Sequence, residues 1–409
     1  MTFQQGICLD SIAPLLLNYL IKIHTMKVPA EFDNIRPFEP EELPQAFSRM
    51  LADPQFRQVL AFALPGVPFE KVRDKMLACK TNFEFQLSFC YGFVQLLIDK
   101  LTTGCDMDAS AIDKDGRYTF VSNHRDIVLD SGFLDKLLID AGFKTTCEIA
   151  IGDNLLSLPW VKDLVRVNKS FIVRRGLSPR ETLTASKLMA DYMHFVINEK
   201  HDNIWIAQRE GRAKDSNDRT QPAILKMMAM GGGKDSIVNK LLRLHIVPLS
   251  ISYEYDPCDF LKAKEFQQKR DNPDWKKSAE DDITSMQTGI TGYKGRVHYQ
   301  CAPCIDAWLG TISHDTPKTE VFDIIAKHID HEIHRNYRMY PSNYIALDML
   351  EGGDTHAGHY TDNDKAAFTK YLDGQLAKID LPQKDEPYLT ERMLTMYANP
   401  AINFINATK

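Results

Sequence analysis

The chain has 409 residues, of which 44% are hydrophobic and 25% are charged. This length predicts two or three packed units, and this balance excludes a disordered or fibrous protein. The net charge is −6, from 49 basic and 55 acidic side chains, so no overall positive field favours a nucleic acid as a partner.

The eight cysteines are scattered along the chain. A protein of this length needs no disulfides to fold, so we expect reduced thiols in a cytoplasmic protein.

Two segments are rich in apolar residues. Ile12–Ile23 is expected to form a helix, and Phe85–Ile98 is shorter than the roughly 20 residues that a bilayer span needs. We therefore predict no transmembrane helix, and any contact with lipid would be peripheral.

The predicted elements divide the chain into three parts. Residues 1–88 show helical periodicity cut by several prolines, which predicts an N-terminal helical domain. Residues 89–310 alternate short β-rich runs with helical stretches, which predicts an α/β domain whose mixed sheet is flanked by helices. Residues 311–409 return to helical periodicity and predict a C-terminal helical extension.

Within the α/β part, short runs rich in β-branched and aromatic residues predict the strands of the sheet. They lie at 118–123, 147–152, 170–176, 203–208, 245–255 and 295–301. Helical patterns at 133–143 and 178–200 separate the earlier strands. A charged stretch at 261–282 separates the last two, and we expect it to be a solvated helical insertion or loop.

One histidine stands where a predicted strand ends. Residues 121–131 read VSNHRDIVLDS, and ligands of α/β folds bind at this edge of the sheet. A carboxylate on one ring nitrogen of His124 would fix the tautomer and raise the basicity of the other, as a general base requires. Alternatively, Asp126 caps the following helix, Asp130 complements its dipole, and His124 is a surface residue.

Two polar clusters also follow predicted strands. Arg174 and Arg175 end the apolar run 171–173, and guanidinium groups can bind phosphate with two hydrogen bonds. The second cluster combines a close backbone approach, positive charge and one acid; it consists of Gly211, Arg212, Lys214 and Glu210. Taken alone, the first cluster could simply be a basic rim around a strand, and the second could simply be a charged loop.

Taken in order, these blocks resemble the four motif blocks of the glycerolipid acyltransferases, which acylate glycerol-3-phosphate or 1-acylglycerol-3-phosphate. The blocks read VSNHRDIVLD, SFIVRRG, AQREGRAKD and HIVPLSISYEY, and the resemblance covers about residues 92–305. It implies transfer of a fatty acyl group from acyl-CoA or acyl-carrier protein to an acceptor hydroxyl, without an acyl-enzyme and with no cofactor beyond the co-substrate. It also implies a cytoplasmic enzyme of phospholipid synthesis, peripheral on the inner face of the membrane.

The resemblance also implies roles for individual residues. His124 would be the base that deprotonates the acceptor hydroxyl, and Asp130 would orient it. The phosphate and glycerol would be held by the two basic blocks, that is by Arg174, Arg175, Glu210, Gly211, Arg212 and Lys214, while Pro248 would shape the fourth block.

Two positions depart from the family pattern. Five residues separate His124 from Asp130, where the family has four, so either Asp130 still reaches the ring or Asp126 takes its place. Arg209 stands where the family usually has proline or valine.

Three alternatives to this function stay open. The acceptor could be a lyso-aminolipid, the same base could catalyse thioester hydrolysis with water in place of the acceptor, or the protein could be a catalytically silent lipid-binding module.

We predict no metal site. Cys301 and Cys304 have the spacing of a zinc or redox pair, but a structural zinc site would need two more ligands at similar spacing.

Overall fold

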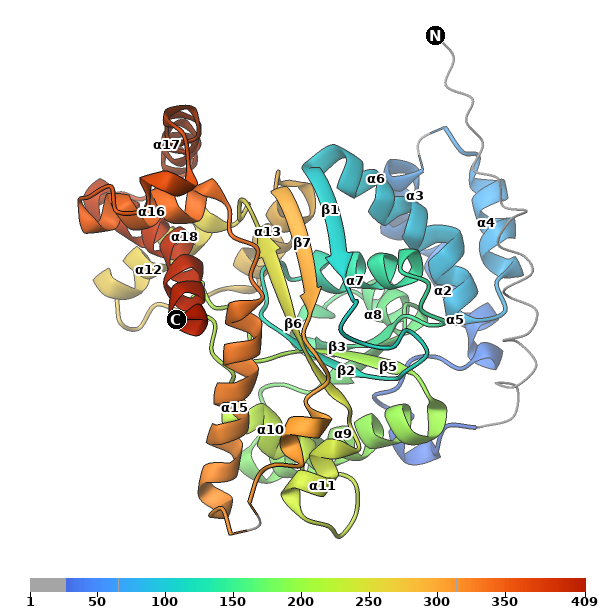
Figure 1. Cartoon of the computed structure of the whole chain (residues 1–409). Coiled ribbons are helices and arrows are strands. Elements are labelled where there is room, and N and C mark those ends of the chain that lie inside the picture. The colour runs from blue at the N-terminus through green and yellow to red at the C-terminus, as the bar shows by residue number, and fades with distance from the viewer. Residues whose placement is uncertain (1–26, 65, 314) are drawn as a thin grey trace.

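The computed structural model describes residues 27–409 except 65 and 314 (Figure 1). The helix expected at 12–23 lies outside the described residues, as does Cys8. None of the helices in the described part of the chain combines the length and the apolarity needed to cross a membrane.

A seven-stranded sheet forms the centre of the molecule. Its strands run in the order β1-β7-β6-β2-β5-β3-β4. The pair β6 and β7 is antiparallel and every other neighbouring pair is parallel, so the predicted mixed sheet is confirmed. The strand bounds are β1 Thr102–Asp108, β2 Thr119–Ser122, β3 Cys147–Gly152, β4 Ser170–Val173, β5 Asn203–Ala207, β6 Ile246–Tyr253 and β7 Gly295–Cys301.

Burial explains which strands the sequence reveals. All eight residues of β6 are buried, as expected for a strand covered on both faces. β1, which the sequence analysis did not predict, is a half-exposed strand at the edge of the sheet. Its sequence TTGCDMD contains no apolar run, because an edge strand does not need one.

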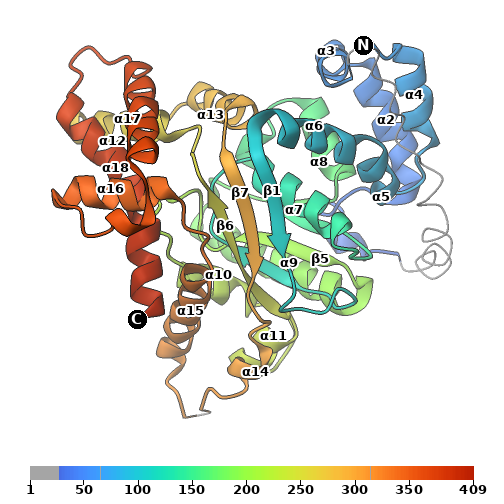
Figure 2. The same ribbon diagram turned by 45° about the horizontal axis from the view of Figure 1, so that its top comes forward.

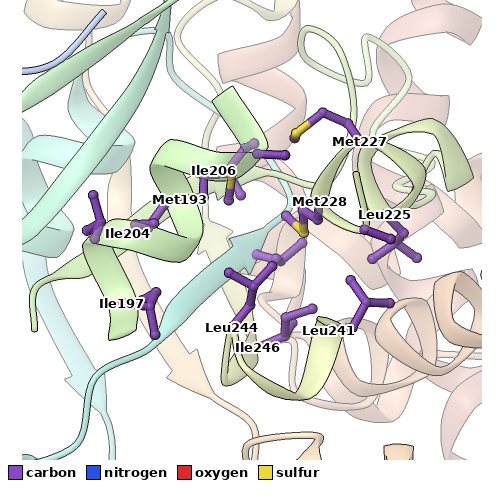
Figure 3. Packing of buried hydrophobic residues seen from close by; sticks show 14 of the residues in the cluster. Met193, Ile197, Ile204, Ile206, Leu225, Met227, Met228, Leu241, Leu244 and Ile246 are labelled. Atoms are coloured by element: carbon purple, nitrogen blue, oxygen red, sulfur yellow. The ribbon is translucent and has the colours of Figure 1, made fainter. Parts of the chain in front are cut away.

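Helices cover both faces of the sheet. On one face, α6 (Tyr91–Leu101) and α7 (Leu129–Asp140) pack against β2, β5, β6 and β7. On the other face, buried side chains of β2, β4, β5 and β6 form a cluster with four helices. These helices are α9 (Pro179–Phe195), α10 (Pro222–Met228), α11 (Ile237–Leu242) and α15 (Lys318–Arg335). Figure 3 shows the centre of this cluster, where Met193, Leu225 and Ile246 come from three different elements.

The N-terminal and C-terminal helices lie on opposite sides of the sheet (Figures 1 and 2). The N-terminal group packs against α8 (Pro159–Val167) through a shared hydrophobic cluster. It consists of α2 Leu43–Ala52, α3 Pro54–Ala63, α4 Phe69–Ala78 and α5 Asn82–Phe85. The C-terminal group after α15 consists of α16 Pro341–Glu351, α17 Asp362–Ala377 and α18 Glu386–Thr408. Short 3-10 or π segments occur at Ala30–Phe32, Pro40–Glu42, Gln86–Cys90, Asp153–Leu155, Val196–Lys200 and Ala357–His359.

The charged insertion between β6 and β7 is only partly solvated. It contains α12 (Asp259–Asp271) and α13 (Ala279–Thr291), and a short α14 (Asp306–Leu309) follows β7. Ala263 of α12 is fully buried in a cluster with side chains of α16, α17 and α18. The expectation of a solvated segment is therefore wrong for α12, because its charged surface conceals a face that packs on the C-terminal helices.

Candidate active site

The turn after β2 is fixed to the neighbouring strand by one side chain. The amide of Asn123 donates to the carbonyl oxygen of Ile251 (2.9 Å) and accepts from its backbone nitrogen (2.8 Å). It therefore pairs with β6 as another strand residue would, and it is fully buried. This contact sets the position from which the next residue, His124, enters the cavity beyond the sheet edge.

The ring of His124 is held on two sides. Its Nδ1 lies 2.7 Å from Oδ2 of Asp130, and its ring packs edge-on against Trp205 with centroids 5.4 Å apart. The side chain is 13% exposed and lines the main cavity. Within the described residues no hydrogen bond engages Nε2, so this nitrogen is the one available to a substrate.

Asp130 is the centre of the local hydrogen-bond network. It lies in the first turn of α7 and is fully buried. Besides the ring of His124, its carboxylate accepts from the backbone nitrogens of Arg125 (2.6 Å) and Asp126 (3.0 Å) and from the hydroxyl of Tyr253 (2.9 Å). Because these donors come from different parts of the fold, they hold the carboxylate of Asp130 in one orientation.

Asp126 has a different function in the fold. One of its oxygens accepts from the backbone nitrogens of Val128 and Leu129, both at 2.9 Å, and so caps α7. Its other oxygen is buried without a hydrogen-bond partner and lies 4.0 Å from Nζ of Lys294. Burial raises the pKa of Asp126 and lowers that of Lys294. The extra residue of the motif is thus absorbed in the capping turn, and Asp130 contacts the ring.

A cavity of about 1490 Å³ lies at this edge of the sheet. It brings together His124 and the polar residues that the sequence analysis selected downstream, namely Arg174, Arg175, Glu210, Gly211, Arg212 and Lys214. Arg180 and Arg209 also contribute to the wall. Pockets for small ligands typically measure roughly 300–1,000 Å³, so this cavity has room for a larger molecule.

The cationic wall of the cavity is only partly neutralised by acids. Arg175 pairs with Glu210 at 2.6 Å, which joins the two basic blocks. Within the described residues, Arg174, Arg209 and Arg212 form no ion pair. Nε of Arg209 and Nη1 of Arg212 are buried without a hydrogen-bond partner. Since unpaired buried donors are costly, an anionic ligand would stabilise this wall.

Lys214 links the wall to the insertion. Its ammonium contacts Glu265 of α12, which also pairs with Lys269 at 2.8 Å. Burial, together with repulsion from Lys269 and Lys277, lowers the pKa of Lys214 to about 7, while the contact with Glu265 acts in the opposite direction.

The rest of the wall is mainly apolar. Side chains of α6, α7, α8, α9, α10 and α13 contribute, among them Val94, Ile139, Leu164, Met189, Met227 and Ile290. The cavity therefore joins a cationic region to an apolar one, which suits an amphipathic ligand with an anionic head and a hydrocarbon chain.

One set of contacts at the site was missed by the sequence analysis. Arg125, next to His124, is buried and makes two hydrogen bonds to Asp218, at 2.7 and 3.2 Å. Tyr337, after α15, donates to the same carboxylate, and Nε2 of His334 lies 2.8 Å from the backbone oxygen of Asp218. No local pattern marks this network, because its partners are about a hundred residues apart or more.

The loop that follows Arg212 is held by the C-terminal helices at further points. The backbone nitrogen of Thr220 donates to Asp330 of α15 (2.6 Å). From α18, the amide of Asn399 donates to the backbone oxygen of Asp215 (2.8 Å). The C-terminal extension therefore fixes the loop adjoining the cationic wall.

Comparison with known proteins identifies the central part of the chain. Residues 107–252 match the family model described as Acyltransferase. This segment is an acyltransferase domain. It contains β2 to β6, His124 and both basic blocks, so the expected enzyme class, an acyltransferase, is confirmed.

Among solved structures, the chain has a match in the 1-acyl-sn-glycerophosphate acyltransferase PlsC from Thermotoga maritima. The similarity has a TM-score of 0.33 and 13% identity, and it covers 71% of this chain and 95% of that one. No curated protein matches the sequence significantly.

Replacing Tyr337 with phenylalanine tests the function of the buried network. The change removes one donor to Asp218 while keeping the ring, and we expect the Michaelis constant for the acyl acceptor to rise several-fold because the loop beside the cationic wall loosens. A hydrogen bond to a charged group contributes roughly 1.5–3 kcal/mol, so unfolding by denaturant should show a loss of that size.

The matched control is Tyr360→Phe. Tyr360 also donates to a carboxylate, that of Asp348 at 2.7 Å, but it lies in the C-terminal group of helices. This variant should leave the Michaelis constant for the acyl acceptor unchanged. Equal effects of both substitutions would show that Tyr337 stabilises the fold only and does not position the site.

Proposed function

We propose that the protein transfers a fatty acyl group from acyl-CoA or acyl-carrier protein to a hydroxyl of glycerol-3-phosphate or 1-acylglycerol-3-phosphate. One observation supports this most directly: a single cavity is lined by His124, which is paired with the buried Asp130, by arginines without an ion pair and by an apolar wall. The histidine suits a hydroxyl, the arginines suit a phosphate, and the apolar wall suits an acyl chain.

In the proposed reaction His124 is the general base. Its Nδ1 keeps a proton directed at Asp130, so Nε2 is free to accept the proton of the acceptor hydroxyl. The hydroxyl oxygen then attacks the thioester carbonyl, the carbon–sulfur bond breaks, and the departing thiolate takes the proton from Nε2. The products are an ester and a free thiol, and His124 returns to its starting state.

Direct transfer agrees with the state of the cysteine in the cavity wall. Among the described residues that line the cavity there is one cysteine, Cys90. Burial raises its pKa to about 12, so its thiol is not activated as a nucleophile. Cys90 is therefore not expected to carry the acyl group, in agreement with direct transfer.

The acceptor phosphate would bind to the cationic wall. Arg174, Arg209 and Arg212 line this wall and form no ion pair within the described chain, and Arg175 is held by Glu210. Gly211 has a φ of +67°, a conformation that favours glycine, and it lets the backbone turn close to the ligand. Arg209, which replaces the usual family residue, adds positive charge to this acceptor site.

Exposed apolar side chains support contact with a lipid surface. Val128, Leu158 and Ile283 line the cavity and are 38%, 39% and 44% exposed. They come from three separate elements, and exposed apolar groups beside a ligand cavity mark interaction surfaces. We propose that the protein binds peripherally to the membrane that supplies its lipid substrates. The cytoplasmic location stays a prediction.

The proposal is tested by measuring thiol release from acyl-CoA and acyl-carrier protein with a panel of acceptors. His124→Ala should lower the rate of acyl transfer by about 10²–10⁴-fold, while circular dichroism shows an unchanged fold. His331→Ala, which changes an exposed histidine of α15, should retain activity. Thiol release at the wild-type rate from His124→Ala would refute the mechanism, and release without any acceptor would identify a thioesterase instead.

The anionic acceptor is tested by Arg212→Gln. Loss of a hydrogen bond to a charged group costs roughly 1.5–3 kcal/mol, so the Michaelis constant for a phosphate-bearing acceptor should rise about 10–100-fold. The constant for the thioester donor should stay the same, and the exposed Arg73→Gln should change neither. An unaltered Michaelis constant for the phosphate-bearing acceptor would contradict a phosphate acceptor and favour a lyso-aminolipid.

A further inference from the structure

Three side chains with metal-binding atoms converge far from the cavity. His245 directly precedes β6, and Cys304 and Asp306 follow β7. Since β6 and β7 are antiparallel, the start of one lies beside the end of the other, and the backbone nitrogen of Ile305 donates to the oxygen of Ile246 (3.0 Å). His124 follows the carboxyl end of β2, which runs parallel to β6. Because His245 precedes β6, the cluster lies at the opposite ends of the strands from His124.

The donor atoms of the cluster are close together. One donor atom from each of the three residues lies within 4.8 Å of the others. Nδ1 of His245 is 2.5 Å from Oδ2 of Asp306, and Oδ1 of Asp306 is buried without a hydrogen-bond partner. Zinc binds nitrogen and sulfur at roughly 2.0–2.3 Å in tetrahedral sites. Ligand atoms on such an ion lie roughly 3.3–3.8 Å apart, so the ion would replace the hydrogen bond between His245 and Asp306 and separate these two atoms.

The backbone holds these residues in place without the ion. His245 has a φ of +46°, which is uncommon for a residue other than glycine. Its carbonyl oxygen accepts from the backbone nitrogen of Thr119 (3.2 Å), so the sheet fixes the unusual conformation. The backbone position of His245 is therefore fixed before an ion binds.

The free thiol of Cys304 is not activated as a nucleophile. Burial raises its pKa to about 12, so the free thiol is protonated and weakly nucleophilic. Cys301 is 1% exposed and packs in the hydrophobic cluster on one face of the sheet. Cys304 packs against the same cluster, and its sulfur also lies near donor atoms of His245 and Asp306.

We propose that His245, Cys304 and Asp306 bind a divalent transition-metal ion of the zinc type. Imidazole and thiolate ligands favour zinc or cobalt over calcium and magnesium, which prefer oxygen. Binding forms a metal–sulfur bond and releases the thiol proton of Cys304 to solvent. Three protein ligands leave a fourth position for water. The ion ties the segment before β6 to the segment after β7 and takes no part in acyl transfer.

A second cluster is a weaker candidate. Asp348, Glu351 and His356 also lie close together. Both oxygens of Asp348, however, already accept hydrogen bonds from the backbone nitrogen of His356, and one also accepts from Tyr360. This cluster contains no thiol, so spectroscopy can distinguish it from the proposed site.

The test is a titration of the full-length, reduced, metal-free protein with Co²⁺. We expect binding of one ion with a thiolate-to-cobalt charge-transfer band in the near ultraviolet, and loss of the band when Zn²⁺ is added. Cys304→Ser should abolish the band, whereas Cys105→Ser, a half-buried cysteine of β1, should keep it. Changes of residues that contact the ligands of a metal typically weaken its binding about 10–100-fold, so loss of a ligand in His245→Gln should weaken binding at least about tenfold.

Thermal unfolding gives an independent readout. Zn²⁺ should raise the Tm of the wild type and of Cys105→Ser, by an amount that grows with the logarithm of its concentration, but not that of Cys304→Ser. A charge-transfer band that persists in Cys304→Ser would overturn the proposal, as would cobalt binding without any such band. Acyl transfer should be the same with and without the ion, so the two proposals fail or stand separately.

Discussion

The buried carboxylate of Asp130 is the interaction on which the site depends. Four donors converge on it: the His124 ring, two backbone nitrogens of the preceding turn, and the hydroxyl of Tyr253 in β6. The hydroxyl of Tyr299 in β7 also donates to its backbone oxygen (2.9 Å). The carboxylate thus joins the turn after β2, the start of α7 and the centre of the sheet. A histidine held in this way needs no movement before it can act as a base.

A second constraint comes from the C-terminal helices. The carboxylate of Asp218 accepts hydrogen bonds from Arg125, in the turn that contains His124, and from Tyr337, in the segment after α15. One buried carboxylate thus connects this turn and the loop after Arg212 to the C-terminal extension. Desolvating such a pair is costly unless its geometry is good, and here two hydrogen bonds from Arg125 and one from Tyr337 satisfy it. The extension is therefore part of the framework that fixes the site.

The sequence predicted what depends on local pattern. Strand and helix periodicity predicted β2 to β7 and the long helices, and the strand-end position of His124 predicted its place in the cavity. β1 was missed because an edge strand needs no apolar run. The burial of α12 was missed because its surface is charged on most sides.

Long-range pairing could not be predicted from the sequence. The sequence predicted Asp130 as the partner of His124 but left Asp126 as an alternative, because a capping turn can absorb one residue and only the folded chain shows which carboxylate reaches the ring. The contacts of Arg125 with Asp218 and of His245 with Asp306 join residues 93 and 61 positions apart. Such pairs leave no periodic signal, so they required the structure.

The central claim is that Asp130 holds His124 in the tautomer that leaves Nε2 free. The most direct test compares the turnover of Asp130→Asn with that of Asp126→Asn. In a serine protease triad, the equivalent change lowers turnover by roughly 10⁴-fold through the wrong tautomer, and we expect a loss of about 10³–10⁴-fold for Asp130→Asn with the fold retained. Asp126→Asn keeps an oxygen that can cap α7 and should stay within about tenfold of the wild type. Full activity in Asp130→Asn, or a larger loss in Asp126→Asn, would contradict the account.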